Sequence, residues 1–338
     1  PLAISFITFT AIATIIDTKF KKNNEELNIK NFTEFLVYFP QLIAGPILRV
    51  TQLVPQLKNR IILNKSNIKF GLILFTIGFV KKIFLADSIA SYIDPFFASS
   101  DTNPDDVIKC FLLFPLQIYF DFSGYVDMAL GASTILGINL PQNFDQPYLS
   151  KSLTKFWRNW HITLSSWFRD YLYIPLGGSR KSKTNLFFNL IFVMSVAGLW
   201  HGASLNFILW GFLNGLILFL EKVFGKFFNI PSFIKIILTC FIIFNLWIVF
   251  RINEFSQLIS FIFEFYSNLN RLFLFENLLI LFILMTGVIS QKFDNFYQIK
   301  KFSHNVPLYI ILPFFMIIIL TGLGMNAGTS EKFIYFEF

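Results

Sequence analysis

The sequence predicts an all-α integral membrane protein, and two observations lead to that prediction. Hydrophobic residues make up 55% of the chain and charged residues 14%, whereas an ordinary soluble domain is roughly 25% charged. The longest uncharged run, from Thr184 to Leu220, contains no Lys, Arg, Asp or Glu. We therefore expect a multi-helix bundle in a bilayer, folded as a single domain over residues 1–338.

The first two segments are unusual. The chain starts at Pro1 with the apolar run Leu2 to Ile16, which lacks the basic start of a signal peptide. We expect the chain to begin inside a larger protein, with earlier helices absent. Phe39 to Ile47 is apolar but carries two prolines and a glycine, which favours a re-entrant segment buried in protein.

Further uncharged stretches recur along the chain, and several are shorter than the roughly 20 residues of a perpendicular span. They lie at residues 70–80, 110–120, 236–250, 277–291 and 305–330. We expect some of their helices to be broken, tilted or buried. Thr184 to Leu220 is the opposite case, because one straight helix would extend about 55 Å. The chain must turn back inside this run, near His201.

Phe156 to Tyr171 predicts a single amphipathic helix at the cytoplasmic interface. Apolar side chains recur there at three- and four-residue spacing, and arginines lie on the other face. The apolar face comprises Trp157, Trp160, Leu164, Trp167, Phe168 and Tyr171. Pro175 and the Gly177-Gly178 pair are expected to end the helix.

Loop charge predicts the orientation. Basic residues dominate Asn139 to Lys183, Glu221 to Pro231 and Gln291 to Asn305, which places these segments in the cytoplasm. Acidic Tyr92 to Val107 and balanced Arg251 to Arg271 then lie outside. The net charge of +8 is spread over short loops, so we exclude nucleic acid as a partner.

Cysteines and histidines indicate no metal or disulfide. Cys110 and Cys240 both lie in apolar runs, which favours core positions. His161, His201 and His304 lack close metal-ligand spacing, so we predict no metal site and no bound cofactor. His304 lies in a polar loop, where a solvated role is expected.

His201 is the leading catalytic candidate. A neutral imidazole at membrane depth can take a proton from a hydroxyl, which is general-base chemistry. A hydrogen-bonded core histidine is the alternative. His161 shares a helix face with Trp157, and interfacial packing alone would also explain it.

Asp121, Tyr125 and Asp127 form a third cluster, within an apolar segment. Buried carboxylates must be paired, hydrogen-bonded or neutral. The cluster could line a substrate cavity, or it could be a structural network that caps a helix broken at Gly124.

Together, these motifs resemble the membrane-bound O-acyltransferases, in particular the bacterial branch of alginate and peptidoglycan O-acetyltransferases. The resemblance rests on Phe39 to Ile47, Asp121 to Asp127, Phe156 to Arg180, Leu199 to Ser204 and Phe333 to Phe338, in that order along the chain. It implies helices around a central tunnel, with His201 as the intramembrane histidine and His161 as the second polar position. It also implies missing N-terminal helices, a cytoplasmic (inner) membrane location and a separate periplasmic acetyltransferase as partner.

The implied reaction moves an acetyl group from a cytoplasmic thioester, acetyl-CoA in the first instance, to a hydroxyl of an extracytoplasmic glycan. Arg158, Arg169, Arg180 and Lys181 are candidates for holding the donor phosphates, although a membrane-surface role is the alternative. Trp200, Tyr125 and Asn159 are candidate donors to the thioester carbonyl. The candidate substrate-binding set is Trp157, Arg158, Asn159, Trp160, Trp200, Asp121, Tyr125 and Asp127.

Three alternatives stay open at this point. The acceptor is expected to be peptidoglycan rather than alginate, because abundant Phe, Ile, Asn and Lys suggest an AT-rich genome. Another acyl group, such as D-alanine placed on teichoic acid, is a close rival. A transporter without chemistry is the rival from another class, since broken helices and intramembrane carboxylates occur there too.

Overall fold

The all-α fold is confirmed. The computed structural model describes residues 4–20, 27–42, 45–59, 63–99, 103–225 and 230–325, and no β-strand occurs in these ranges. The first half contains α1 (Ile4–Lys19), α2 (Ile29–Leu36), α3 (Phe39–Leu42), α4 (Val50–Lys58), α5 (Lys65–Phe79), α6 (Asp87–Ala98), α7 (Pro104–Ile135), α8 (Leu153–Asn159) and α9 (Ile162–Phe168). The second half contains α10 (Lys183–His201), α11 (Leu205–Phe224), α12 (Ser232–Arg251), α13 (Phe255–Ser267), α14 (Phe275–Ser290), α15 (Phe296–Asn305) and α16 (Leu308–Met325).

Five of these helices are long and apolar enough to cross a membrane, namely α7, α10, α11, α12 and α16. Helix α14 is apolar but shorter. The expectation that some apolar helices are buried is also met, because α7 is almost wholly buried inside the protein. A π-helical turn over Val80–Ala86 joins α5 to α6, and the backbone keeps helical angles at both of its ends.

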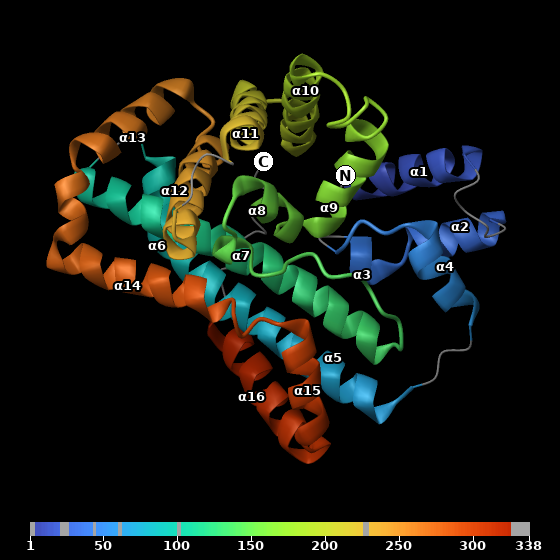
Figure 1. The fold of residues 1–338 in the computed structure, drawn as a ribbon. Helices are drawn as coiled ribbons and strands as arrows, with labels where there is room; N and C mark the ends of the chain where they lie inside the picture. Colours follow the sequence, from blue (N-terminus) through green and yellow to red (C-terminus); the bar gives the residue numbers. More distant parts are fainter. Residues whose placement is uncertain are drawn as a thin grey trace.

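Helices α5 and α7 run side by side through the middle of the molecule (Figure 1). A Cβ on Gly124 of α7 would lie 2.7 Å from the carbonyl oxygen of Gly78 in α5, and one on Gly131 would lie 2.7 Å from that of Gly71. Small residues at such positions allow the helix backbones to touch. The pair forms the central support on which the candidate site rests.

Buried charges also join the π-helical turn after α5 to α7. Lys82 Nζ lies 2.5 Å from Asp121 Oδ1 and 2.7 Å from Asp87 Oδ1. Lys81 Nζ lies 2.6 Å from Asp127 Oδ2 and also contacts Asp294. Both lysines are buried, and the π-helical turn carries them. These pairs satisfy carboxylates that would otherwise be very costly inside the protein.

Helix α7 passes through Gly124 without interruption. The interpretation in which Gly124 breaks the helix is therefore wrong. Close packing explains the glycine instead, since any side chain there would meet the backbone of α5.

The predicted single helix over Phe156–Tyr171 is wrong as well. The chain forms α8, then breaks at Trp160 and His161, and resumes as α9, which continues into a π-helical turn over Arg169–Tyr173. His161 adopts left-handed backbone angles, with φ 43° and ψ 56°. Helical periodicity therefore does not carry across this residue. The expected ending is confirmed, with Gly177 and Gly178 at positive φ.

Polar contacts join segments that loop charge assigned to the same side of the membrane. Arg251 Nη2 lies 3.0 Å from Asp94 Oδ1, and both belong to predicted outer segments. Glu221 Oε2 accepts a 2.6 Å hydrogen bond from the backbone N–H of Leu153, and both belong to predicted cytoplasmic segments. The contacts agree with the predicted alternation.

Candidate active site

The expected turn in the long uncharged run is confirmed, and His201 lies directly at it. His201 is the last residue of α10, and α11 begins four residues later. The side chain of Ser204 caps α11 by accepting a 3.2 Å hydrogen bond from the backbone N–H of Asn206. An N-cap serine satisfies one of the free N–H groups of a helix start.

Glycines hold the two arms of this hairpin together. A Cβ on Gly198 of α10 would collide with the backbone carbonyl of Phe207 in α11. A Cβ on Gly211 would collide with Met194 O, and one on Gly215 would lie 2.8 Å from Ile191 Cα. The direct contact between the two helices fixes where the hairpin presents His201.

The His201 ring is half-buried in an aromatic cage. Its centroid lies 4.8 Å from that of Trp200, 5.0 Å from Phe250 and 5.4 Å from Trp210. The indole N–H of Trp210 is buried and finds no hydrogen-bond partner within the described residues.

A cavity of about 140 Å³ reaches the His201 ring. Its walls come from α8 to α11 and from the π-helical turn after α9. The lining includes Trp157, Ser165, Arg169, Tyr173, Met194 and Trp210. Arg169 and Tyr173, which belong to the predicted cytoplasmic segment, therefore line the same cavity as His201.

The backbone around His161 is held by hydrogen bonds to Asn143, in the loop that follows α7. The backbone carbonyl of Asn143 accepts a 3.0 Å hydrogen bond from Ile162 N–H. Its side-chain Oδ1 accepts from Thr163 N–H at 3.0 Å and from the Thr163 hydroxyl at 2.7 Å. Left-handed angles are uncommon for a residue other than glycine and often mark functional positions. The hydrogen bonds to Asn143 hold His161 in that conformation.

The His161 side chain is almost completely buried, at 1% exposure. Its ring centroid lies 4.7 Å from that of Phe122 in α7 and 6.4 Å from Phe6 in α1. Burial lowers the pKa of His161 well below its usual value, and the nearby His201 lowers it further. The imidazole is therefore neutral near pH 7, with one nitrogen to donate and one to accept.

Trp200 connects the two histidines. Its ring centroid lies 6.2 Å from that of His161 and 4.8 Å from that of His201. Both nitrogens of His161 and the indole N–H of Trp200 are buried, and none forms a hydrogen bond with the described part of the chain. Buried polar atoms are rarely left unpaired in native proteins. Such atoms are suited to bind the polar parts of a substrate.

The other residues predicted on α8 have different environments. Trp157 lines the cavity and donates a 3.1 Å hydrogen bond from Nε1 to Asn214 Oδ1. Arg158 is exposed. Asn159 is buried and donates from Nδ2 to Ser150 Oγ at 3.2 Å. This bond directs the Asn159 amide to Ser150.

Trp160 is fully buried in an aromatic stack behind the site, with its ring centroid 5.5 Å from Phe156 and 4.9 Å from Trp247. It precedes His161 directly. The position of Trp160 therefore anchors the break between α8 and α9.

The acidic cluster faces α5. Asp121 and Asp127 are engaged with Lys82 and Lys81, and the ammonium of Lys82 lies 5.6 Å from the ring centroid of Tyr125. Phe122, from the same segment, packs against the ring of His161. The structure thus brings His161, His201, Trp200 and Trp157 together and holds the two carboxylates in ion pairs.

Asn143, Ser165 and Trp210 border the site and were missed in the sequence. Asn143 lies 18 positions before His161, in a loop with no recognisable motif. Trp210 could have been found, because it lies in the same uncharged run as His201, on the second helix of the predicted hairpin.

Two other motifs are only partly covered. In the proline-containing segment, α3 is short, Ile43 and Ala44 lie outside the described residues, and Ile47 is buried. The backbone N–H of Ile47 donates a 2.9 Å hydrogen bond to Thr163 Oγ1, which ties this segment to α9. The closing motif Phe333 to Phe338 lies outside the described residues.

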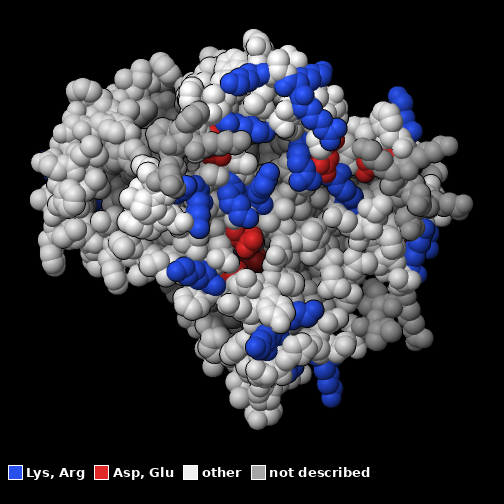
Figure 2. Space-filling model, in the orientation of Figure 1, with Lys and Arg blue, Asp and Glu red and all other residues white. Residues whose placement is uncertain are grey.

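Basic side chains gather on one face of the molecule over α8, α9 and the start of α10 (Figure 2). This distribution agrees with the basic segment Asn139 to Lys183, which loop charge assigned to the cytoplasm. The cavity to His201 is lined at this end by Arg169.

Comparison with known proteins gives a consistent family. The membrane-bound O-acyltransferase family profile matches residues 18–261. The probable alginate O-acetylase AlgI of Pseudomonas putida is 42% identical over 255 residues, which cover 74% of this chain and 52% of that protein. The peptidoglycan O-acetyltransferase of Helicobacter pylori is 38% identical over 286 residues, which cover 74% of this chain and 54% of that protein.

A more distant relative carries a different acyl group. The teichoic acid D-alanyltransferase of Bacillus subtilis is 28% identical over 254 residues, which cover 68% of this chain and 62% of that protein. The chain spans about half the length of the first two relatives. The matched region and the five apolar helices establish a multi-pass membrane protein, and the chain belongs to the membrane-bound O-acyltransferase family.

Proposed function

We propose that this chain forms the membrane-embedded part of an O-acetyltransferase that modifies a glycan outside the cytoplasmic membrane. One observation supports it most directly, namely that His201 lines a cavity together with Arg169 and Tyr173 of the predicted cytoplasmic segment. A general base must be reachable by the reacting groups.

His201 acts as the general base in this proposal. Its imidazole takes the proton of the acceptor hydroxyl while the hydroxyl oxygen attacks the carbonyl carbon of the thioester. The carbon–sulfur bond then breaks, and the thiol leaves with the proton held by His201. The ester bond that forms carries the acetyl group.

His161 and Trp200 have a binding role. Both present buried polar atoms that lack a partner within the described residues. An N–H directed at the carbonyl oxygen would stabilise the negative charge that develops there. The neutral state of His161 allows it to act as such a donor without the cost of a buried charge.

The donor is proposed to be acetyl-CoA. A cavity of about 140 Å³ is small beside the roughly 300–1,000 Å³ of typical ligand pockets, which favours a short acyl group. Arg169 at its predicted cytoplasmic end and exposed Arg158 are suited to hold donor phosphates.

The acceptor is proposed to be peptidoglycan, with alginate as the rival. The two acetyltransferases are 42% and 38% identical to this chain, whereas the D-alanyltransferase is 28% identical, which favours acetyl over D-alanyl transfer. We further propose that the hydroxyl deprotonated by His201 belongs to a periplasmic acetyltransferase, which then passes the acetyl group to the glycan.

The test replaces His201 with Ala in the full-length protein and measures ester-linked acetyl groups on cell-wall and secreted glycans by mass spectrometry. Loss of acetylation is expected, with unchanged accumulation in the membrane. Leu205→Ala is the control, because Leu205 lies in the same turn but is 79% exposed. Retained acetylation in the His201 variant would remove this residue from the mechanism.

A second assay separates the enzyme from a transporter. Membranes with the full-length protein should transfer labelled acetyl from acetyl-CoA without any ion gradient. Transfer of labelled D-alanine in place of acetyl would contradict the proposed acyl group. Uptake of the donor that needs an ion gradient, with no acetyl transferred, would indicate a transporter.

A further inference from the structure

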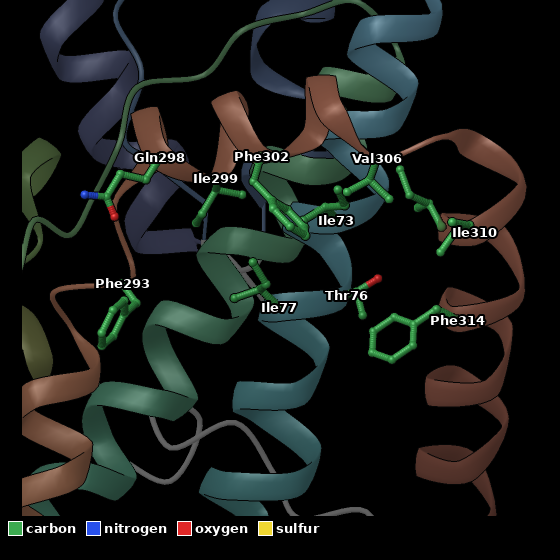
Figure 3. Close-up of a pocket in the computed structure, with 11 residues that line it drawn as sticks. Ile73, Thr76, Ile77, Phe293, Gln298, Ile299, Phe302, Val306, Ile310 and Phe314 are labelled. Carbon is green, nitrogen blue, oxygen red and sulfur yellow. The ribbon is translucent and has the colours of Figure 1, made fainter.

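A groove between α5, α15 and α16 lies away from the candidate active site. Its volume is about 570 Å³, and its lining is apolar apart from Thr76 and Gln298. Figure 3 shows Ile73, Thr76 and Ile77 of α5 on one side, Ile310 and Phe314 of α16 on the other, and α15 across one end.

The groove walls are open to the surroundings. Phe302 and Phe314 are each 59% exposed, and Phe293 is 75% exposed. Aromatic side chains with this exposure in a membrane protein are positioned to contact hydrocarbon chains. Ile73, Thr76 and Ile77 of α5 face Ile310, Ile311 and Phe314 of α16 across the groove, and these largely apolar walls suit part of an acyl chain.

The helix across the end of the groove has two unlike faces. Ile299, Phe302 and Val306 line the groove, while Lys300 and Lys301 are exposed. Such an amphipathic helix is typical of the boundary between lipid tails and headgroups. Helix α15 belongs to a segment that loop charge places in the cytoplasm.

Positive charge gathers at this end of the groove. Helices α5 and α15 contribute Lys65, Lys69, Lys300 and Lys301 and contain no Asp or Glu. Lys69 Nζ donates a 3.0 Å hydrogen bond to the backbone carbonyl of His304, which brings the two helix ends together. The neighbouring acid, Asp294, is engaged with Lys81 and Tyr119. Figure 2 shows basic side chains over the region of α15.

We propose that this groove is a selective binding site for an anionic glycerophospholipid of the cytoplasmic leaflet. One acyl chain lies between α5 and α16, and the phosphate is held by Lys69, Lys300 and Lys301. The apolar walls alone would accept any lipid. The four lysines without a carboxylate in either helix select the negative headgroup.

The experiment measures lipid retained by the purified full-length protein. Native mass spectrometry follows competition between dioleoylphosphatidylglycerol and dioleoylphosphatidylcholine, which share acyl chains and differ in net charge. Preferential retention of phosphatidylglycerol is expected. Equal retention, or no retained lipid, would overturn the proposal and would mean that the groove is non-selective or covered by another part of the protein.

Two variants test the two halves of the site. Lys300→Gln with Lys301→Gln should weaken the preference by about fivefold for each lysine removed. The control Lys151→Gln with Lys183→Gln removes the same charge from exposed positions on the same predicted side and should leave it unchanged. An equal loss in both double variants would indicate general surface attraction and refute the site.

Ile310→Trp tests the groove itself. Ile310 is 52% exposed and points into the groove from α16 (Figure 3), so a larger ring fills the space without entering the core. Retention of both lipids should fall. Unchanged retention would show that the lysines act without the groove and would refute the proposal.

Discussion

Gly211→Ala is the sharpest test of how the hairpin positions His201. The added Cβ would collide with Met194 O and would lie 2.7 Å from Ser195 Cα. An ordinary contact of this kind is at least 3.4 Å. Helices α10 and α11 must therefore separate by more than about 0.7 Å at this point, since Met194 O lies even nearer than Ser195 Cα and both obstacles belong to the backbone.

Two energies oppose each other in this variant. Overpacking of a well-packed contact costs about 1–3 kcal/mol. Alanine is better than glycine in a helix by about 1 kcal/mol. The net expected loss of stability is about 0–2 kcal/mol, so the protein should still fold.

The effect on acetyl transfer should be larger than the effect on stability. Helix α11 carries Phe207 and Trp210, whose ring centroids lie 6.2 Å and 5.4 Å from that of His201. A misplacement of about 1 Å can cost about 10²-fold in rate. We expect a 10- to 100-fold lower rate of labelled acetyl transfer in membranes containing the full-length protein.

Gly225→Ala is the matched control. Gly225 follows the same helix, has φ −59°, and its Cβ would meet the nearest atom at an ordinary 3.6 Å. The melting temperature and the transfer rate should be unchanged or slightly raised. A wild-type rate for Gly211→Ala, at a wild-type melting temperature, would refute the reasoning that this contact positions His201.

The remaining predictions concern residues around the site. Asn143→Ala should lower both stability and transfer, because each buried donor of Thr163 left without Oδ1 costs about 1–3 kcal/mol. A detergent melting assay measures the loss, and a wild-type melting temperature would contradict it. Lys81→Met should destabilise the protein by about 3–5 kcal/mol, since Asp127 and Asp294 lose their buried partner, and a melting temperature equal to wild type would contradict this. Burial lowers the pKa of His161, so the unfolded chain takes up a proton below about pH 6.5 while the folded protein does not. The stability of the wild-type protein should therefore fall more steeply than that of His161→Phe when the pH is lowered from 7 to 5. Parallel curves of stability against pH would argue against a buried neutral imidazole.

The helical membrane fold follows from the sequence because its signal is local. Charge is absent over whole stretches such as Thr184 to Leu220, and the length limit of a bilayer forces a turn near His201. The hairpin of α10 and α11 was therefore predictable without any knowledge of neighbours. The family also follows from the sequence, since its motifs are continuous segments.

The geometry of the second histidine was decided by the tertiary structure. Trp157, Trp160 and Leu164 keep helical spacing across His161, so periodicity favours one helix where two exist. The break is stabilised by Asn143, from a loop distant in the chain, whose hydrogen bonds replace those lost between the helices.

The tertiary structure also determined which groups pair with the buried carboxylates. Asp121 and Asp127 required some partner wherever they lay, and the sequence determined that much. Only the packing of α5 on α7 assigned Lys82 and Lys81 to them. A hydrophobic pattern is a property of neighbouring residues, whereas an ion pair depends on which helices meet, and this meeting is set by the glycine contacts between them.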